Sequence, residues 1–175
     1  EIQPPYNSYG NGAAMRVSPI GWLFDDLPVA LEIAKIVTEV SHSHPEGVKG
    51  AQAVVLAIYL ARNGAEGEAI REAVAEMFGY DMDRNVDICR DEHIYNETCQ
   101  YCVPESIICA IEAESYEDAI RNAISLGGDA DTLAAISGGI AEAMFGIPAN
   151  LIEEVQPFLK SDLHPVIQQF YERLK

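Results

Sequence analysis

Apolar residues recur at helical spacing along most of this chain, and this recurrence constrains the fold more than any other feature. No segment shows the two-residue alternation that is typical of a half-buried strand. The pattern therefore predicts an all-α fold, a compact bundle of about seven or eight helices. The helical stretches are residues 29–40, 46–64, 66–80, 105–113, 115–128, 131–146, 149–160 and 164–175.

Local signals mark several helix ends. Gly79 and Gly127 follow helical stretches, at positions where glycine commonly ends a helix, and Ser115 is placed to cap the helix after it. Residues 79–103 show no regular pattern, and we expect a long surface loop there. The stretch 131–146 is rich in alanine, glycine and serine, so a neighbour can approach it closely, and we expect it to be central. Within residues 29–40, five apolar residues fall on one stripe at helical spacing, namely Val29, Ile33, Ile36, Val37 and Val40.

The composition excludes two classes of partner. The 175 residues suit one domain, 1–175, and 28 acidic against 11 basic residues give a net charge of −17. Such a chain is unsuited to wrapping nucleic acid, which needs a basic surface. No stretch is long and apolar enough to span a membrane. We expect a cytoplasmic protein that binds no nucleic acid and no membrane.

The four cysteines leave two interpretations. Cys99 and Cys102 form a C-x-x-C pair, while Cys89 and Cys109 lie ten and seven residues outside it. Zinc binding or redox chemistry is one interpretation, but the spacing gives one tight pair and two distant thiols. We favour the other, reduced thiols in a cytoplasmic protein.

The segment GGDADT, residues 127–132, brings three oxygen-bearing side chains together at the start of a helix. Asp129, Asp131 and Thr132 suit helix capping, because such oxygens accept backbone N–H groups and the negative charge favours this end of the dipole. One aspartate would be enough for capping, however. Two carboxylates this close repel each other unless a cation lies between them, and Mg²⁺ or Ca²⁺ prefers such donors. Capping and metal binding both stay open from the spacing alone.

A glycine-rich loop and a histidine pair are the other candidates. The segment NSYGNGAAMRVSPIG has the glycines that a phosphate-binding nest of backbone N–H groups needs, but by themselves these residues favour a tight loop before a helix. In SHSHPEG, His42 and His44 are candidate metal ligands or proton carriers, and the alternative is a polar connection with Ser43 as a helix cap. The candidate ligand-binding residues are Ser8, Tyr9, Gly10, Asn11, Gly12 and His42.

Taken together, SYGNGAAMRVSPIG, SHSHPEG and SLGGDADTLAAISGGIAEAMFGIP resemble the ADP-ribosylglycohydrolase family, which includes the dinitrogenase reductase-activating glycohydrolases. The resemblance implies an all-α fold and a cleft with two Mg²⁺ or Mn²⁺ ions. It implies hydrolysis of the bond between ADP-ribose and a protein side chain or small acceptor. The implied metal ligands are Asp129, Asp131 and Thr132, with Asp131 as the catalytic residue, and the implied ligand-binding residues are Ser8, Tyr9, Gly10, Asn11 and His42.

One family motif is absent from these residues. Family members carry a T-D-D motif before the glycine-rich loop, and this sequence contains none. We therefore expect the carboxy-terminal two-thirds of a larger domain, with a complementary amino-terminal segment or chain as a partner. We expect the 175 residues alone to bind metal weakly and to be inactive. The alternative is a non-catalytic relative that binds ADP-ribose or is structural, like the family's crystallin-like members.

Overall fold

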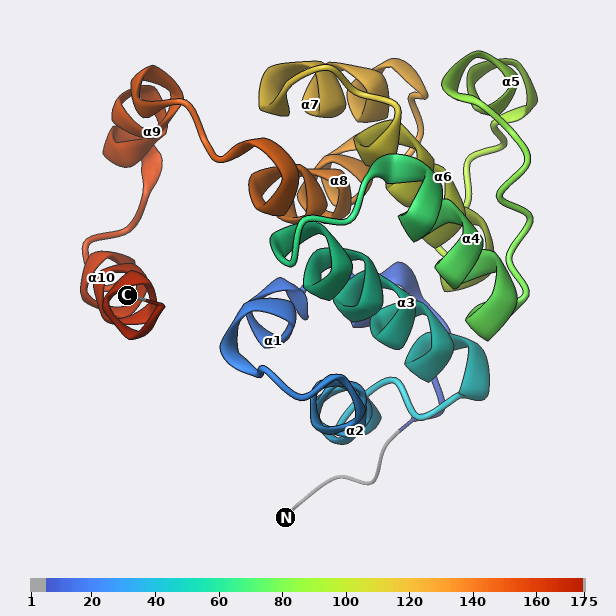
Figure 1. Ribbon diagram of the computed structural model, residues 1–175, viewed down its shortest axis with the longest axis horizontal. Helices are drawn as coiled ribbons and strands as arrows, with labels where there is room; N and C mark the ends of the chain where they lie inside the picture. The colour runs from blue at the N-terminus through green and yellow to red at the C-terminus, as the bar shows by residue number, and fades with distance from the viewer. Residues whose placement is uncertain (1–5, 175) are drawn as a thin grey trace.

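The computed structural model describes residues 6–174, and it confirms the all-α fold (Figure 1). Ten α-helices lie in this part of the chain, more than the seven or eight expected. Within it, none of the helices combines the length and the apolar character needed to cross a membrane. The elements are η1 (Asn11–Ala13), α1 (Ser18–Leu23), α2 (Leu27–Glu39), α3 (Pro45–Arg62), α4 (Gly67–Phe78), α5 (Val86–Glu92), α6 (Cys99–Ile111), α7 (Tyr116–Ser125), α8 (Ala130–Phe145), α9 (Ala149–Val155), η2 (Gln156–Phe158) and α10 (Leu163–Arg173).

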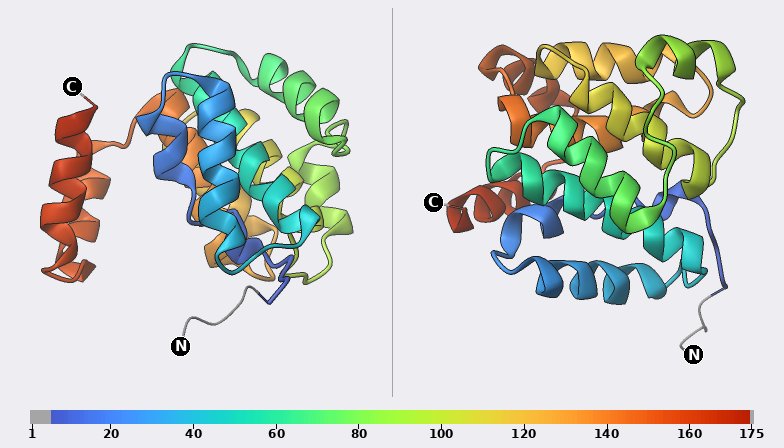
Figure 2. Two further views of the ribbon diagram at one scale, coloured as in Figure 1. Left: turned by 90° about the horizontal axis from the view of Figure 1, so that it is seen from below. Right: turned by 45° about the vertical axis from the view of Figure 1, so that its right-hand side comes forward.

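Helices α3, α6 and α8 form the centre of the molecule. Helix α3 contacts α1, α2, α4, α6 and α8, and α8 in turn contacts α1, α3, α6 and α7. The central position expected for the small-residue helix is therefore confirmed. Helices α9 and α10 stand apart from this body (Figure 2). A hydrogen bond of 2.5 Å from the Tyr171 hydroxyl to Glu142 links α10 to α8.

The helix ends that the sequence marks are confirmed. Gly79 follows α4 with φ +65°, and Gly127 follows α7 with φ +80°, so both adopt the left-handed conformation that favours glycine. The Ser115 hydroxyl accepts a hydrogen bond from the Asp118 backbone N–H at 3.1 Å and caps α7. These local signals set the boundaries of the helices that carry the site.

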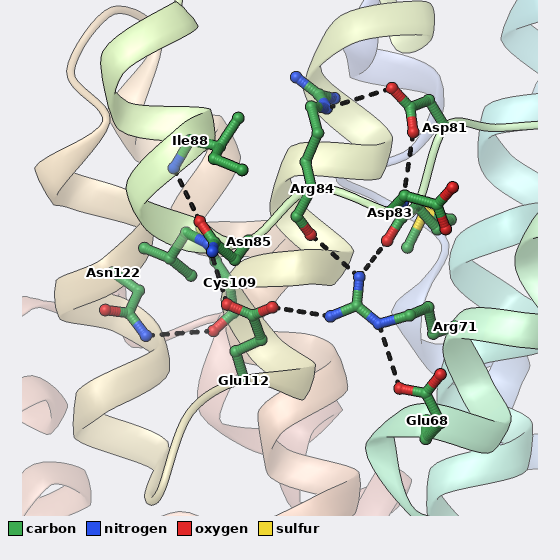
Figure 3. A network of polar contacts seen from close by, with 12 residues as sticks. Glu68, Arg71, Asp81, Asp83, Arg84, Asn85, Ile88, Cys109, Glu112 and Asn122 are labelled. Atoms are coloured by element: carbon green, nitrogen blue, oxygen red, sulfur yellow. Dashed lines mark hydrogen bonds and ion pairs between the residues drawn. The ribbon is translucent and has the colours of Figure 1, made fainter.

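The surface loop expected over residues 79–103 is wrong. Helix α5 forms inside this segment, and α6 begins at Cys99, upstream of the predicted start, with Pro104 in its interior. Buried side chains also anchor the segment. Arg71 donates to the Met82 and Arg84 carbonyls, and Glu112 joins Arg71 to the Val86 backbone N–H (Figure 3). The buried members are Tyr80, Met82, Val86, Cys89, Cys99, Cys102 and Val103.

Four of the five residues in the apolar stripe predicted for 29–40 are exposed, and only Ile33 packs against the core. Val40 is 73% exposed and Ile36 is 52% exposed, whereas Ala30 and Ala34 are fully buried on the inner face. Because Ala30 and Ala34 are small, α2 can lie close to α3. This close packing favours burial of the alanines over burial of Ile36 and Val40. The helical period is thus confirmed, but most of the predicted stripe is exposed, while Leu27, Leu31 and Ile33 pack against the core beside the small buried residues.

The crossing of α1 and α3 depends on Gly21. A Cβ atom added there would lie 2.6 Å from Cγ2 of Ile58, a branched side chain fixed in the core. We expect Gly21→Ala to lower the free energy of unfolding by about 1–3 kcal/mol through overpacking, as measured by urea denaturation. Gly138→Ala is the matched control, because its Cβ would meet the flexible end of Ile120 at 3.0 Å, and we expect a change below about 1 kcal/mol. Equal stability of the two variants would contradict this.

Candidate functional site

The glycine-rich loop and the GGDADT turn meet in the folded chain. The side-chain amide of Asn11, in η1, donates a hydrogen bond to the Asp129 carboxylate at 2.5 Å. The Thr132 hydroxyl lies 3.8 Å from the sulfur of Met15, which follows the same loop. Two motifs that are more than a hundred residues apart therefore form one surface at the amino end of α8, and a few convergent polar groups of this kind are typical of ligand-binding sites.

The GGDADT turn starts α8 without a side-chain cap from Asp129. Asp129 is the N-cap residue of α8, but its side chain caps no backbone N–H group. Asp131 accepts only the N–H of the adjacent Thr132, at 2.9 Å. Gly128 takes a φ of +61°, which turns the chain so that Asp129 faces Asn11. Capping is therefore not the role of the Asp129 carboxylate.

The tight loop that the sequence favours at Gly10, Asn11 and Gly12 is confirmed, and the alternative, a phosphate-binding nest, is wrong in its backbone conformation. Gly10 has a φ of −64°, and the residues after it form the short helix η1. The Gly10 N–H donates to the Ser8 hydroxyl at 3.1 Å, and the Asn11 N–H donates to the Glu97 carbonyl at 2.7 Å. These two N–H groups are committed within the chain, so they do not form an open anion cradle.

The other ligand-binding candidates surround this loop. His42 is buried, and Arg16 donates to its Nδ1 at 2.8 Å, which leaves the ring proton of neutral His42 on Nε2. If Gly12 carried a Cβ atom, that atom would lie 3.2 Å from Nε2 of His42, so the histidine ring lies directly beside this glycine. The ring of Tyr9 is 46% exposed and contacts His44 edge-on at 5.2 Å.

His44 has a different role from its neighbour. Its Nδ1 accepts the Glu46 backbone N–H at 3.1 Å and caps α3. The expected cap at Ser43 is therefore wrong, because the ring nitrogen of the next residue takes that position.

The environment of His42 predicts its titration. Burial lowers the pKa of His42 below 6.5, and the charge of Arg16 lowers it further. The unfolded chain then binds more protons than the folded chain below pH 6.5, so stability falls as the pH decreases through this range. In an NMR titration, we expect His42 to protonate below pH 6.5, and we expect Arg16→Met to raise the pKa of His42. A pKa of His42 above 6.5 would contradict the buried, neutral ring.

The GGDADT donors fit a hard divalent cation in type, though they are few. Asp129, Asp131 and Thr132 supply only oxygen atoms, which Mg²⁺ and Mn²⁺ accept. Between residues 6 and 174, neither aspartate forms an ion pair, so their charges stay unneutralised. In the same range, no group of three or more histidine, cysteine, aspartate or glutamate side chains gathers in a metal-like arrangement.

Sequence reasoning missed the residues behind this site. Glu105 of α6 is 3% exposed and pairs with Arg84 at 3.4 Å and with His93 at 2.8 Å. The connection from His93 to Thr98, which joins α5 to α6, reaches the GGDADT turn at Gly128. The available signal was a glutamate within the apolar run VPESIICAI, where a charge has to be paired.

The four cysteines are free and buried, and two of them support the loop. Cys99 donates to the Gly10 carbonyl at 3.3 Å, and Cys102 accepts from the Asn11 amide at 3.3 Å. Burial raises the pKa of Cys99 to about 12 and that of Cys102 to about 11, so both are protonated and unreactive at neutral pH.

Comparisons with known proteins place these motifs in a family context. The model of the ADP-ribosylglycohydrolase family matches residues 2–175. ADP-ribosylhydrolase ARH3 of Mus musculus is 26% identical over 216 residues, which cover 93% of this chain and 58% of that protein. ADP-ribosylarginine hydrolase Tri1 of Pseudomonas putida is 26% identical over 177 residues, which cover 94% of this chain and 46% of that protein.

A solved structure shares the fold. The ADP-ribosylglycohydrolase-related protein complex superimposes with a TM-score of 0.76 at 23% identity, over 98% of this chain and 61% of that chain. The chain therefore spans about half to three-fifths of the length of the proteins it resembles.

Proposed function

Because this chain belongs to the ADP-ribosylglycohydrolase family, we propose that it contributes to a metal-dependent hydrolase that cleaves the glycosidic bond between ADP-ribose and an acceptor. The acceptor is a protein side chain or a small molecule. Asp129, Asp131 and Thr132 hold Mg²⁺ or Mn²⁺ in this proposal. Residues 1–175 form the carboxy-terminal part of the catalytic domain, and a T-D-D-bearing segment supplies further ligands.

The contact between Asn11 and Asp129 carries this proposal. It joins the loop expected to hold ADP-ribose to the turn expected to hold the metal. The bond fixes one oxygen of Asp129 and leaves the other free for a cation, while exposed Asp131 faces solvent. A bound divalent ion polarises the ribose hydroxyls and lowers the pKa of a coordinated water.

The chain's own residues bind and orient the nucleotide. The exposed ring of Tyr9 offers a stacking surface for the base, and His42 directs Nε2 toward the loop at Gly12. Arg16 bonds the Gly12 carbonyl at 2.6 Å and holds a positive charge beside the loop, where an anionic ligand needs one in a chain of net charge −17. Positive charge develops on the ribose as the glycosidic bond breaks, and the carboxylates stabilise it.

The test uses peptides that carry ADP-ribose on arginine or serine. We expect release of ADP-ribose when this chain, Mn²⁺ and a T-D-D-bearing segment are combined, and loss of release when a chelator removes the metal. Release that persists unchanged with the chelator would contradict metal dependence.

A second candidate is a non-catalytic protein that binds ADP-ribose. The small number of acidic donors at the turn favours it, because a paired-metal site needs more ligands than these residues supply. The same mixture of this chain, Mn²⁺ and a T-D-D-bearing segment distinguishes the two candidates. If calorimetry detects ADP-ribose binding by this mixture while neither peptide is hydrolysed, the result favours the binding protein over the hydrolase.

A further inference from the structure

We infer that His93 is a positioning residue for the metal-binding turn, and that Glu105 holds His93 in place. This inference rests on the proposed function, since it assigns a role toward Asp129. Neither residue belongs to the motifs that carry the family resemblance. Both lie in or beside the segment that the sequence marks as irregular.

The first step is the orientation of the imidazole. Glu105 accepts a hydrogen bond from Nδ1 of His93 at 2.8 Å, and both side chains are almost fully buried, at 4% and 6% exposure. Because Nδ1 donates to Glu105, Nε2 is the ring nitrogen that points away from this carboxylate. A carboxylate behind a histidine fixes the direction of the ring in this way.

The second step is what the ring faces. Nε2 of His93 is buried and has no hydrogen-bond partner among the described residues. If Gly128 carried a Cβ atom, that atom would lie 2.5 Å from Nε2 of His93 and 3.4 Å from the ring of Tyr95. The histidine therefore fills the space beside the backbone of Gly128.

The third step connects this contact to the site. Gly128 has a φ of +61° and directly precedes Asp129, so the conformation of this glycine sets the direction of the Asp129 carboxylate. On its other side, Asp129 is held by the Asn11 amide. His93 therefore limits the movement of the turn at Gly128. The Asn11 amide fixes the carboxylate of Asp129, the next residue.

The experiment follows the Asn11 side-chain amide by NMR in the ¹⁵N-labelled 175-residue chain, first without metal and then with added Mn²⁺. His93→Gln keeps a donor for Glu105 but removes the ring from Gly128. Arg84→Met is the matched control, because it removes the other partner of the same carboxylate. Thermal unfolding of each variant shows that it is folded.

We expect His93→Gln to shift the Asn11 amide signal in the metal-free chain. We also expect it to raise about tenfold the Mn²⁺ concentration at which this signal loses half its height, which is the usual size of effect for residues that orient metal ligands. We expect Arg84→Met to change that concentration by less than about twofold. His93→Ala, a second variant, is expected to act like His93→Gln.

Two results would overturn the inference. One is an Asn11 signal that stays in place in both His93 variants. The other is an equal shift in Arg84→Met, which would show general loosening around Glu105. If Mn²⁺ broadens no signal in the unmodified chain, metal binding fails, but the metal-free shift of Asn11 still tests the role of His93.

Discussion

Replacement of Asp131 by asparagine is expected to lower the rate of ADP-ribose release at least about a hundredfold when this chain is combined with Mn²⁺ and a T-D-D-bearing segment. Mutation of residues that only support a metal ligand already lowers metal affinity or activity about 10–100-fold. Asparagine has nearly the same shape, and its oxygen can still accept the Thr132 N–H that Asp131 accepts at 2.9 Å. The helix start should therefore survive, while the negative charge that a divalent cation needs is lost. Initial rates of ADP-ribose release measure the effect.

Asp26→Asn provides the matched control for this loss. Asp26 also lies at the start of a helix, where it caps α2 by accepting the Val29 N–H at 3.0 Å. We expect Asp26→Asn to retain full activity, because this carboxylate lies outside the proposed site. An Asp131→Asn enzyme as active as the Asp26→Asn enzyme would rule out the catalytic role of Asp131.

Glu105→Ala is expected to lower the free energy of unfolding by about 3–5 kcal/mol, the usual loss when one partner of a buried ion pair is removed. Glu105 is 3% exposed and pairs with both Arg84 and His93. Its removal leaves a mostly buried guanidinium and a buried ring nitrogen without their shared acceptor. Urea denaturation with a common slope for both proteins measures the difference.

A surface pair sets the scale for this effect. Glu117 pairs with Arg121 at 2.6 Å on α7, where both side chains are more than half exposed. We expect Glu117→Ala to cost at most about 1 kcal/mol. If Glu105→Ala costs no more than Glu117→Ala, the buried carboxylate is not a structural anchor.

The sequence predicts the helices well where local chemistry fixes their ends. Gly79, Gly127 and Ser115 act through their own backbone or through neighbours within three residues, and the structure confirms all three. The start of α6 depends on longer-range contacts instead. Cys99 bonds the loop at Gly10, 89 residues away, and this packing extends the helix through Pro104 against the usual preference.

The candidate site shows the same division. The oxygen donors of GGDADT can be identified by residue type, but the bond from Asn11 to Asp129 spans 118 positions and has no local signal. No anion-binding nest forms at Gly10, because the backbone N–H groups of Gly10 and Asn11 already donate to Ser8 and Glu97. The glycine content of the loop alone does not reveal these acceptors. In α2, the fully buried residues are Ala30, Ala34 and Thr38, and these small side chains let the helix pack closely against α3.

The most direct test of a cation site at the GGDADT turn is an anomalous difference map from crystals of this chain grown with millimolar Mn²⁺ and ADP-ribose. We predict a manganese peak beside Asp129, Asp131 and Thr132, with the nucleotide against the loop that contains Asn11. Manganese peaks elsewhere on this acidic chain, with none beside these three side chains, would contradict the site.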